Sequence, residues 1–242
     1  MTCCASLLAA FRFLTILPLP WRETGPRDLG RAVGWFPLVG LAMGAVLAAI
    51  DWLASPALPA GVVAGLVMVV WLVANGAIHF DGFLDTCDGL FGGRTPEQRL
   101  DIMRDHRVGA FAVAGGILLL LMQYSALTSL GSRTLPLLLA PMLGRWAIAL
   151  AIVLFPYARE QGLGRAMKDE AEWPQALLAT GIALAAAGLA GGWMGMAAML
   201  AAGAAMLAAA AFIQTRIPGL TGDSYGAIVE VVEVIVLMVF LF

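Results

Sequence analysis

Three aspartates stand at a spacing that can bring their carboxylates together. Asp81, Asp85 and Asp88 occupy positions i, i+4 and i+7 of the stretch HFDGFLDTCDGL. At about 100° per residue, a helix would carry all three within an arc of about 60°. Like charges at such spacing repel one another and favour a bound cation, and Mg²⁺ prefers hard oxygen ligands of this kind. Capping of a helix end would explain one aspartate but not three, so we predict a magnesium site.

A second polar stretch, RLDIMRDHRVG at 99–109, carries arginines that suit a phosphate. Arg104 and Arg107 are three positions apart, and their planar forks match phosphate or pyrophosphate oxygens. Asp105 lies between them and is a candidate to extend the metal site. Taken alone, the stretch fits a run of surface ion pairs equally well. Its proximity to the aspartate cluster favours phosphate binding.

The third polar stretch is the glycine-rich sequence PGLTGDSYGA at 218–227, which precedes an apolar run containing two acids. Gly222 allows backbone amides to approach an anion at a helix N-terminus. Asp223 could cap that helix or bind a metal. Glu230 and Glu233 share one face further along, and ionisable residues within an apolar run are costly unless they face a partner or a wet cavity.

Two single residues complete the candidate set. Arg145 lies in the middle of a long apolar run, where an arginine indicates an acidic or phosphate partner. His79 precedes the aspartate cluster, and we assign it to substrate binding through hydrogen bonds rather than to the metal.

Composition places these residues in a membrane protein. Of the 242 residues, 61% are hydrophobic and 12% are charged, whereas a soluble domain is about half apolar and a quarter charged. The net charge of −2 gives no indication of nucleic-acid binding. We therefore expect an all-α, polytopic membrane helical bundle that forms a single domain over residues 1–242.

The apolar runs predict about seven transmembrane helices. A shorter N-terminal segment, 3–19, is expected to be an interfacial or re-entrant helix, and the fifth and sixth runs could form one hairpin at Gly191 and Gly192. The seven runs are 33–53, 60–79, 110–130, 135–156, 176–191, 193–213 and 226–242.

Loop charges orient these runs. Eleven Lys and Arg residues fall in the loops on one side and one on the other, which predicts a cytoplasmic N-terminus. Nearly all acids fall on the same side, although orientation does not require this. We therefore expect a multi-pass protein of a bacterial inner membrane, with its metal-dependent site facing the cytoplasm.

These polar stretches resemble the cobalamin synthase family, the adenosylcobinamide-GDP ribazoletransferases. The resemblance rests on HFDGFLDTCDGL at 79–90, IMRDHRVGAF at 102–111 and TGDSYGA at 221–227 with the two following glutamates, and FRFLTILPLP at 11–20 also matches. Length and hydropathy agree over nearly the whole chain. Two positions depart from the family pattern, because Arg104 stands where a Lys is expected and Ala112 where a Gly is expected.

The resemblance implies an Mg²⁺-dependent transferase that joins adenosylcobinamide-GDP to α-ribazole or its 5′-phosphate and releases GMP. In that reaction Asp81, Asp85 and Asp88, followed by Asp105 and Asp223, would hold the metal. Either Glu230 or Glu233 would be the general base or a second metal ligand. Phosphate and substrate binding would fall to Arg104, Arg107, Arg145, His79 and Gly222.

Three alternatives remain open at this point. A CDP-alcohol phosphotransferase or a prenyltransferase would also place aspartate-rich helices at the cytoplasmic face. A divalent-cation transporter would need acids near mid-span and on both sides of the membrane, which this sequence lacks. The expected partners are the two substrates and the lipid bilayer, and a homo-oligomer or an assembly with other enzymes of the pathway also remains open.

Overall fold

The computed structural model describes residues 3–19 and 25–242, which form helices joined by short loops. Within these residues the single β pairing is a parallel bridge between Tyr157 and Leu220. The helices are α1 (Cys3–Leu14), α2 (Pro26–Ala32), the 3₁₀ turn η1 (Val33–Trp35), α3 (Phe36–Ala54), α4 (Ala60–Ala74), α5 (Ile78–Gly92), α6 (Pro96–Ile102), α7 (Ala110–Ser129), α8 (Thr134–Leu154), α9 (Leu163–Glu170), α10 (Trp173–Gln214) and α11 (Gly222–Val239).

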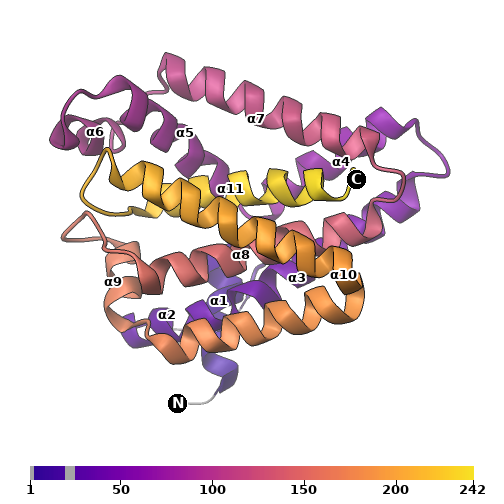
Figure 1. Cartoon of the computed structure of the whole chain (residues 1–242), viewed down its shortest axis with the longest axis horizontal. Coiled ribbons are helices and arrows are strands. Elements are labelled where there is room, and N and C mark those ends of the chain that lie inside the picture. The colour runs from indigo at the N-terminus through magenta and orange to yellow at the C-terminus, as the bar shows by residue number, and fades with distance from the viewer. Residues whose placement is uncertain (1–2, 20–24) are drawn as a thin grey trace.

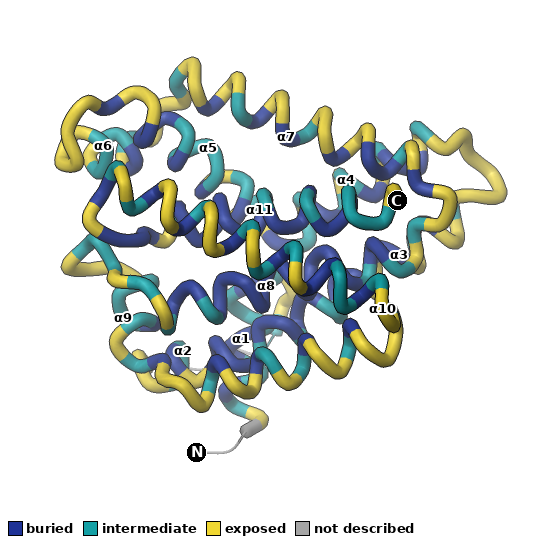
Figure 2. The backbone as a smooth tube through the Cα atoms, in the orientation of Figure 1, coloured by how far each residue is buried: buried dark blue, intermediate teal, exposed yellow. Residues whose placement is uncertain are grey.

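Helix α11 forms the centre of the bundle. It packs against α5, α7, α8 and α10, and Figure 2 shows α11 and α8 dark blue along much of their length. Helices α3 and α8 also pack closely, because Gly40 and Gly44 lie one turn apart against the backbone of α8, where a Cβ atom would collide with carbonyl oxygens. Small residues at this spacing are typical of helix pairs in membranes.

The outer surface is apolar, as expected of a bundle surrounded by lipid. Large hydrophobic side chains such as Leu118 on α7 and Leu189 and Leu200 on α10 are more than 60% exposed. Exposed tryptophans mark both ends of the bundle, with Trp173 at the start of α10 and Trp193 at its turn. Tryptophan favours membrane–water interfaces, and 20 helical residues between the two span about 30 Å, the thickness of the hydrocarbon core.

The all-α membrane bundle predicted from sequence is confirmed, but the count of seven spans is not. Four helices in the described residues are long and apolar enough to cross a membrane, namely 26–54, α7, α8 and α10. A fifth would be formed by α4 and α5 together, which are bent by 88°. Helix α4 falls short because it ends at Ala74 instead of continuing to residue 79, and α11 carries three acids.

Helix α10 is the hairpin predicted at Gly191 and Gly192. Gly192 has φ +53° and interrupts the helical backbone, and Figure 1 shows the chain turning back there. The N-terminal α1 is too short to cross a membrane, and the segment after it is tied to the end of α4 by a bond from the Ile16 amide to the Ala74 carbonyl. Its interfacial position stays a prediction.

The two ends of the bundle differ in charge. One end, called the polar end here, contains residues 81–109, 156–172 and 215–223, and lies at the left of Figure 1. The opposite end contains the last turn of α3 from residue 51 and residues 55–59, 130–133 and 191–192. Its described charged side chains are Asp51 and Arg133, which form an ion pair at 2.6 Å. Polar chemistry is therefore concentrated at the polar end.

Candidate active site at the polar end

Helix α5 brings the three predicted aspartates to the polar end. It begins after a sharp break in which Gly76 and Ala77 both have positive φ, and this break turns the chain away from α4. Gly82 then packs directly on α11, since a Cβ there would lie 2.8 Å from the Asp223 carbonyl oxygen. From Asp81 onward, α5 lies level with the first turns of α7 and α11, outside the four spanning helices.

A polar cavity of about 380 Å³ opens beside this face of α5. Asp81 is exposed, Asp85 is half-buried and Asp88 is buried, so the face runs from solvent into the protein. The opposite wall is the loop after α6, which brings two arginines and an acid to the cavity as predicted. The charged and titratable residues that line it are Asp81, Asp85, Asp88, Arg104, Asp105, His106, Arg107 and Arg159.

Asp88 also has a structural role. One of its oxygens accepts a hydrogen bond from the Gly109 amide at 2.5 Å, and the other accepts one from the Ala112 amide at 2.8 Å. These amides belong to the start of α7, whose first N–H groups have no helical partner, so Asp88 caps α7 from another helix. The third carboxylate of the predicted cluster thus fixes the junction between α5 and α7.

Asp85 lies where a negative charge is costly. Partial burial, followed by the charges of Asp223 and Asp81, raises the pKa of Asp85 from 3.8 to about 7, and Arg159 opposes the shift only in part. A carboxyl group perturbed by burial and by like charges is typical of functional sites, and a cation there would relieve the repulsion.

Two charged residues of the loop after α6 are paired with each other. Arg107 donates to Asp105, with Nη2 and Oδ2 2.6 Å apart, and this bond holds the pKa of Asp105 at about 2. The Arg107 side chain is 88% exposed. Because Asp105 is already paired with Arg107, it is less available to a metal than Asp81 or Asp85 are.

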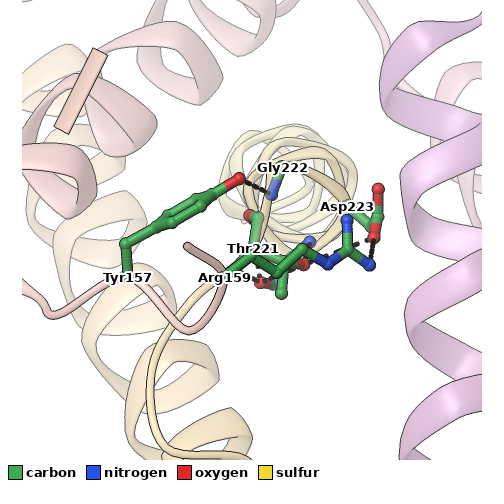
Figure 3. Close-up of polar contacts among 6 residues, drawn as sticks. Tyr157, Arg159, Thr221, Gly222 and Asp223 are labelled. Atoms are coloured by element: carbon green, nitrogen blue, oxygen red, sulfur yellow. Dashed lines mark hydrogen bonds and ion pairs between the residues drawn. The ribbon is translucent and has the colours of Figure 1, made fainter. Parts of the chain in front are cut away.

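The loop at 156–159 contributes a residue that the sequence interpretation missed. Two backbone hydrogen bonds of 2.8 Å join Leu220 to Pro156 and Ala158, and this short bridge fixes Arg159 beside α11. Arg159 Nη2 donates to Asp223 Oδ2 at 2.7 Å (Figure 3). No sequence motif marks Arg159, because it reaches the site through pairing with a loop some 60 residues later.

The glycine-rich stretch forms the N-terminus of α11. Thr221 caps the helix by accepting from the Ser224 amide, and the Gly222 amide donates to the Tyr157 hydroxyl at 3.2 Å (Figure 3). Burial raises the pKa of Asp223, although its bond to Arg159 opposes the shift. Gly222, Asp223 and His79 line a second cavity of about 270 Å³, which shares Asp81 and Arg159 with the polar cavity.

Three other predicted residues lie in the apolar interior, away from both cavities. Arg145 and Glu233 form an ion pair in which their side chains are 0% and 1% exposed. Arg145 thus has the acidic partner that its mid-span position indicated. Glu230, also buried, lines a separate and largely apolar cavity with Asn75 and Gln123. The assignment of these three to catalysis or substrate binding stays a prediction.

The donor set suits a magnesium ion held jointly by protein and substrate. Among the described residues, no three His, Cys, Asp or Glu side chains lie close enough together to hold a metal by themselves. Mg²⁺ commonly takes only one or two protein carboxylates and completes its shell with water and substrate phosphates. The carboxylates of Asp81 and Asp85 line the same cavity, and the charge of Asp81 contributes to the raised pKa of Asp85, which fits that arrangement.

Comparison with known proteins identifies similar sequences. The chain matches the family described as cobalamin-5-phosphate synthase over residues 6–241. It is 37% identical to the adenosylcobinamide-GDP ribazoletransferase of Desulforamulus reducens, covering 98% of this chain and 96% of that protein. The enzyme of the same name from Deinococcus radiodurans is 40% identical over 96% of this chain and 84% of its own length. No solved structure matches the chain.

Proposed function

Since the chain belongs to the cobalamin-5-phosphate synthase family, we propose that it catalyses the reaction for which its relatives are named. In this reaction the phosphocobinamide part of adenosylcobinamide-GDP is transferred to α-ribazole or its 5′-phosphate, and GMP is released. The observation that carries the proposal is the polar cavity, in which three carboxylates of α5 face Arg104, Arg107 and Arg159.

A diphosphate fits between these two sets of charges. Arginine forks bind phosphate oxygens, whereas carboxylates repel them unless a cation lies between. Asp81 and Asp85 would hold that Mg²⁺ together with the substrate, while the third predicted ligand, Asp88, caps α7. The ion would neutralise charge on the diphosphate and on the departing GMP. Arg104 and Arg159 would bind the non-bridging oxygens of the phosphoryl group being transferred.

The transfer itself makes one bond and breaks one. A ribose hydroxyl oxygen of the acceptor attacks the phosphorus atom on the corrinoid side of the diphosphate. The phosphoanhydride bond to GMP then breaks, and GMP leaves with the electron pair. The hydroxyl proton passes to a carboxylate.

Asp223 is the best placed carboxylate to accept this proton. It comes from a different helix than the α5 cluster and lines the second cavity, while its raised pKa makes it a better base near neutral pH. Its contact with Arg159 would keep it next to the phosphoryl group. Glu230 and Glu233, the acids favoured from sequence, line neither cavity at the polar end.

We further propose that the polar end faces the cytoplasm of a bacterial cell. The loops at this end carry most of the Lys and Arg residues, and such loops remain cytoplasmic as a rule. The water-soluble product GMP would then be released into the compartment where nucleotides are used.

The decisive experiment is product analysis with purified protein in lipid nanodiscs. Adenosylcobinamide-GDP, α-ribazole 5′-phosphate and Mg²⁺ should yield GMP and the 5′-phosphate of the complete corrinoid in equal amounts. EDTA should abolish both products, and added Mg²⁺ should restore them. Folded, magnesium-loaded protein that yields no GMP, or that instead cleaves a CDP-alcohol or prenyl diphosphate, would contradict the proposal.

Two variants test the residue assignments. Asp85→Asn should lower kcat by about 10²-fold or more and raise the Mg²⁺ concentration needed for half-maximal rate. Asp101→Asn is the matched control, because Asp101 is an exposed acid on the neighbouring α6 that lies outside the cavity. Equal activity of both variants would refute the metal assignment.

Asp223→Asn should also lower kcat by about 10²-fold, but without changing the Mg²⁺ dependence. At saturating Mg²⁺, the pH profile of its residual rate should lose the part of the acidic limb that reports the ionisation of Asp223. An unchanged profile would refute Asp223 as the base.

A further inference from the structure

The second cavity at the polar end has a different chemical character from the first. Its volume is about 270 Å³, and it lies behind α5, between α8, α9 and the start of α11. It meets the polar cavity at Asp81 and Arg159, which line both. A molecule bound here would therefore touch the place where a diphosphate in the polar cavity is expected to react.

Its walls suit a flat ring. Tyr157 and Tyr225 lie side by side on one wall, with ring centroids 6.0 Å apart and planes inclined by 33°. Ile148, Ile152 and Met167 add aliphatic surface. Aromatic and branched aliphatic side chains of this kind bury the faces of heterocyclic rings. The volume lies just below the range of about 300–1,000 Å³ for drug-sized ligands, so a nucleoside fits and a corrinoid does not.

Two residues that line this cavity each have a buried side-chain atom without a hydrogen-bond partner. His79 is 4% exposed and its Nε2 is unpartnered, and Tyr225 is 6% exposed with an unpartnered hydroxyl. Both residues line the cavity. A buried polar group without a partner is destabilising, and few remain in folded proteins unless a ligand or water completes them. A purely apolar occupant such as an acyl chain would leave both unsatisfied.

We propose that this second cavity, the acceptor cavity, binds the nucleoside that receives the phosphoryl group. The heterocyclic base lies against Tyr157 and Tyr225, and its free ring nitrogen accepts a hydrogen bond from His79 or from the Tyr225 hydroxyl. The ribose then lies toward Asp81 and Arg159, where its hydroxyl meets the diphosphate held in the polar cavity. This inference rests on the proposed function and divides the two substrates between the two cavities.

A pair of filling substitutions separates the cavities. Leu163 is 60% exposed and lines the acceptor cavity, whereas Val108 is 65% exposed and lines the polar cavity. Leu163→Trp should raise KM for α-ribazole by about tenfold or more and leave KM for adenosylcobinamide-GDP unchanged. Val108→Trp should do the reverse. Leu189→Trp, on the lipid-facing side of α10, is the control that should change neither.

A binding measurement tests the same cavity without turnover. Tyr225→Phe keeps the ring but removes the unpartnered hydroxyl, so the protein should fold as before. Equilibrium dialysis of α-ribazole against protein in nanodiscs, with no activated corrinoid present, should show an affinity about three- to tenfold weaker than that of the unsubstituted protein. Equal affinity would overturn the role of Tyr225 in recognition.

The outcomes distinguish this inference from the function it rests on. If the unsubstituted protein releases no GMP, the proposed function fails. If it releases GMP but Leu163→Trp raises KM for adenosylcobinamide-GDP, or changes neither KM, the acceptor cavity is wrong and the function stands. A raised KM for α-ribazole alone, together with weaker binding by Tyr225→Phe, supports the assignment.

Discussion

The buried pair of Arg145 and Glu233 allows a test that separates folding from catalysis. Both side chains are almost completely excluded from solvent, so removing one leaves the other charge unpaired in the interior. Breaking such a pair costs about 3–5 kcal/mol of unfolding free energy. We expect Glu233→Met to cost about 3 kcal/mol, the low end of that range, because Glu230 is near enough to interact with the Arg145 charge.

The two single substitutions should differ. A lone carboxyl group can take up a proton and become neutral, whereas a guanidinium group stays charged. Arg145→Met should therefore cost less than Glu233→Met. The double variant removes both charges and replaces them with apolar side chains, which is often neutral or stabilising. We expect it to lie within about 1 kcal/mol of the original stability.

Unfolding by SDS in mixed micelles, followed by circular dichroism, measures these differences, and GMP release measures function. If the pair only supports the fold, the double variant should be both stable and active. A double variant as unstable as Glu233→Met would refute the argument from charge burial. A stable but inactive double variant would instead support the prediction, made from sequence, that Glu233 takes part in the reaction.

Three further perturbations have defined outcomes. Gly82→Ala would place a methyl group 2.8 Å from the Asp223 carbonyl oxygen. It should lower the free energy of unfolding by about 1–3 kcal/mol in the same assay. Gly188→Ala is the control and should not change the stability, because its methyl group would meet nothing within 4 Å. Asp88→Ala removes two hydrogen bonds to the first amides of α7 and should lower the free energy of unfolding by about 1–2 kcal/mol. Faster hydrogen exchange at residues 109–112 would show the loss of the cap. Unchanged exchange would contradict the capping role of Asp88. Because folding raises the pKa of Asp85 from 3.8 to about 7, protonation of Asp85 stabilises the folded protein, and this stabilisation is lost as the pH rises through about 7. Metal-free protein should therefore be less stable at about pH 8 than at about pH 5, with Mg²⁺ or Asp85→Asn reducing the difference.

The aspartate cluster was predictable because its geometry is local. The spacing of Asp81, Asp85 and Asp88 alone fixes one helical face, and the structure has that helix. The break before it was harder to foresee. Gly76 permits a positive φ, but Ala77 also adopts one, and an alanine carries no signal for that conformation. The apolar run to residue 79 therefore predicts one continuous span.

Contacts between distant segments set the limit of sequence interpretation. The positions of Arg145 and of the two glutamates within apolar runs each indicated a partner, but the sequence does not show which glutamate meets Arg145, because Arg145 and Glu233 are 88 residues apart. Arg159 was not recognised as a site residue for the same reason, since its place depends on a bridge to Leu220. The glutamates of α11 shared a face as predicted, yet that face meets α8 and the apolar interior rather than the polar cavity.

The central position of α11 has a consequence for how the protein is made. Helix α8 enters the membrane with Arg145 well before its partner exists, because Glu233 is translated 88 residues later. At about 5–20 residues per second, this interval is about 4–18 seconds. During that time the arginine needs another counter-charge, which the insertion machinery or lipid phosphates can supply. Arrival of α11 would then release this temporary partner and close the bundle in a single late step.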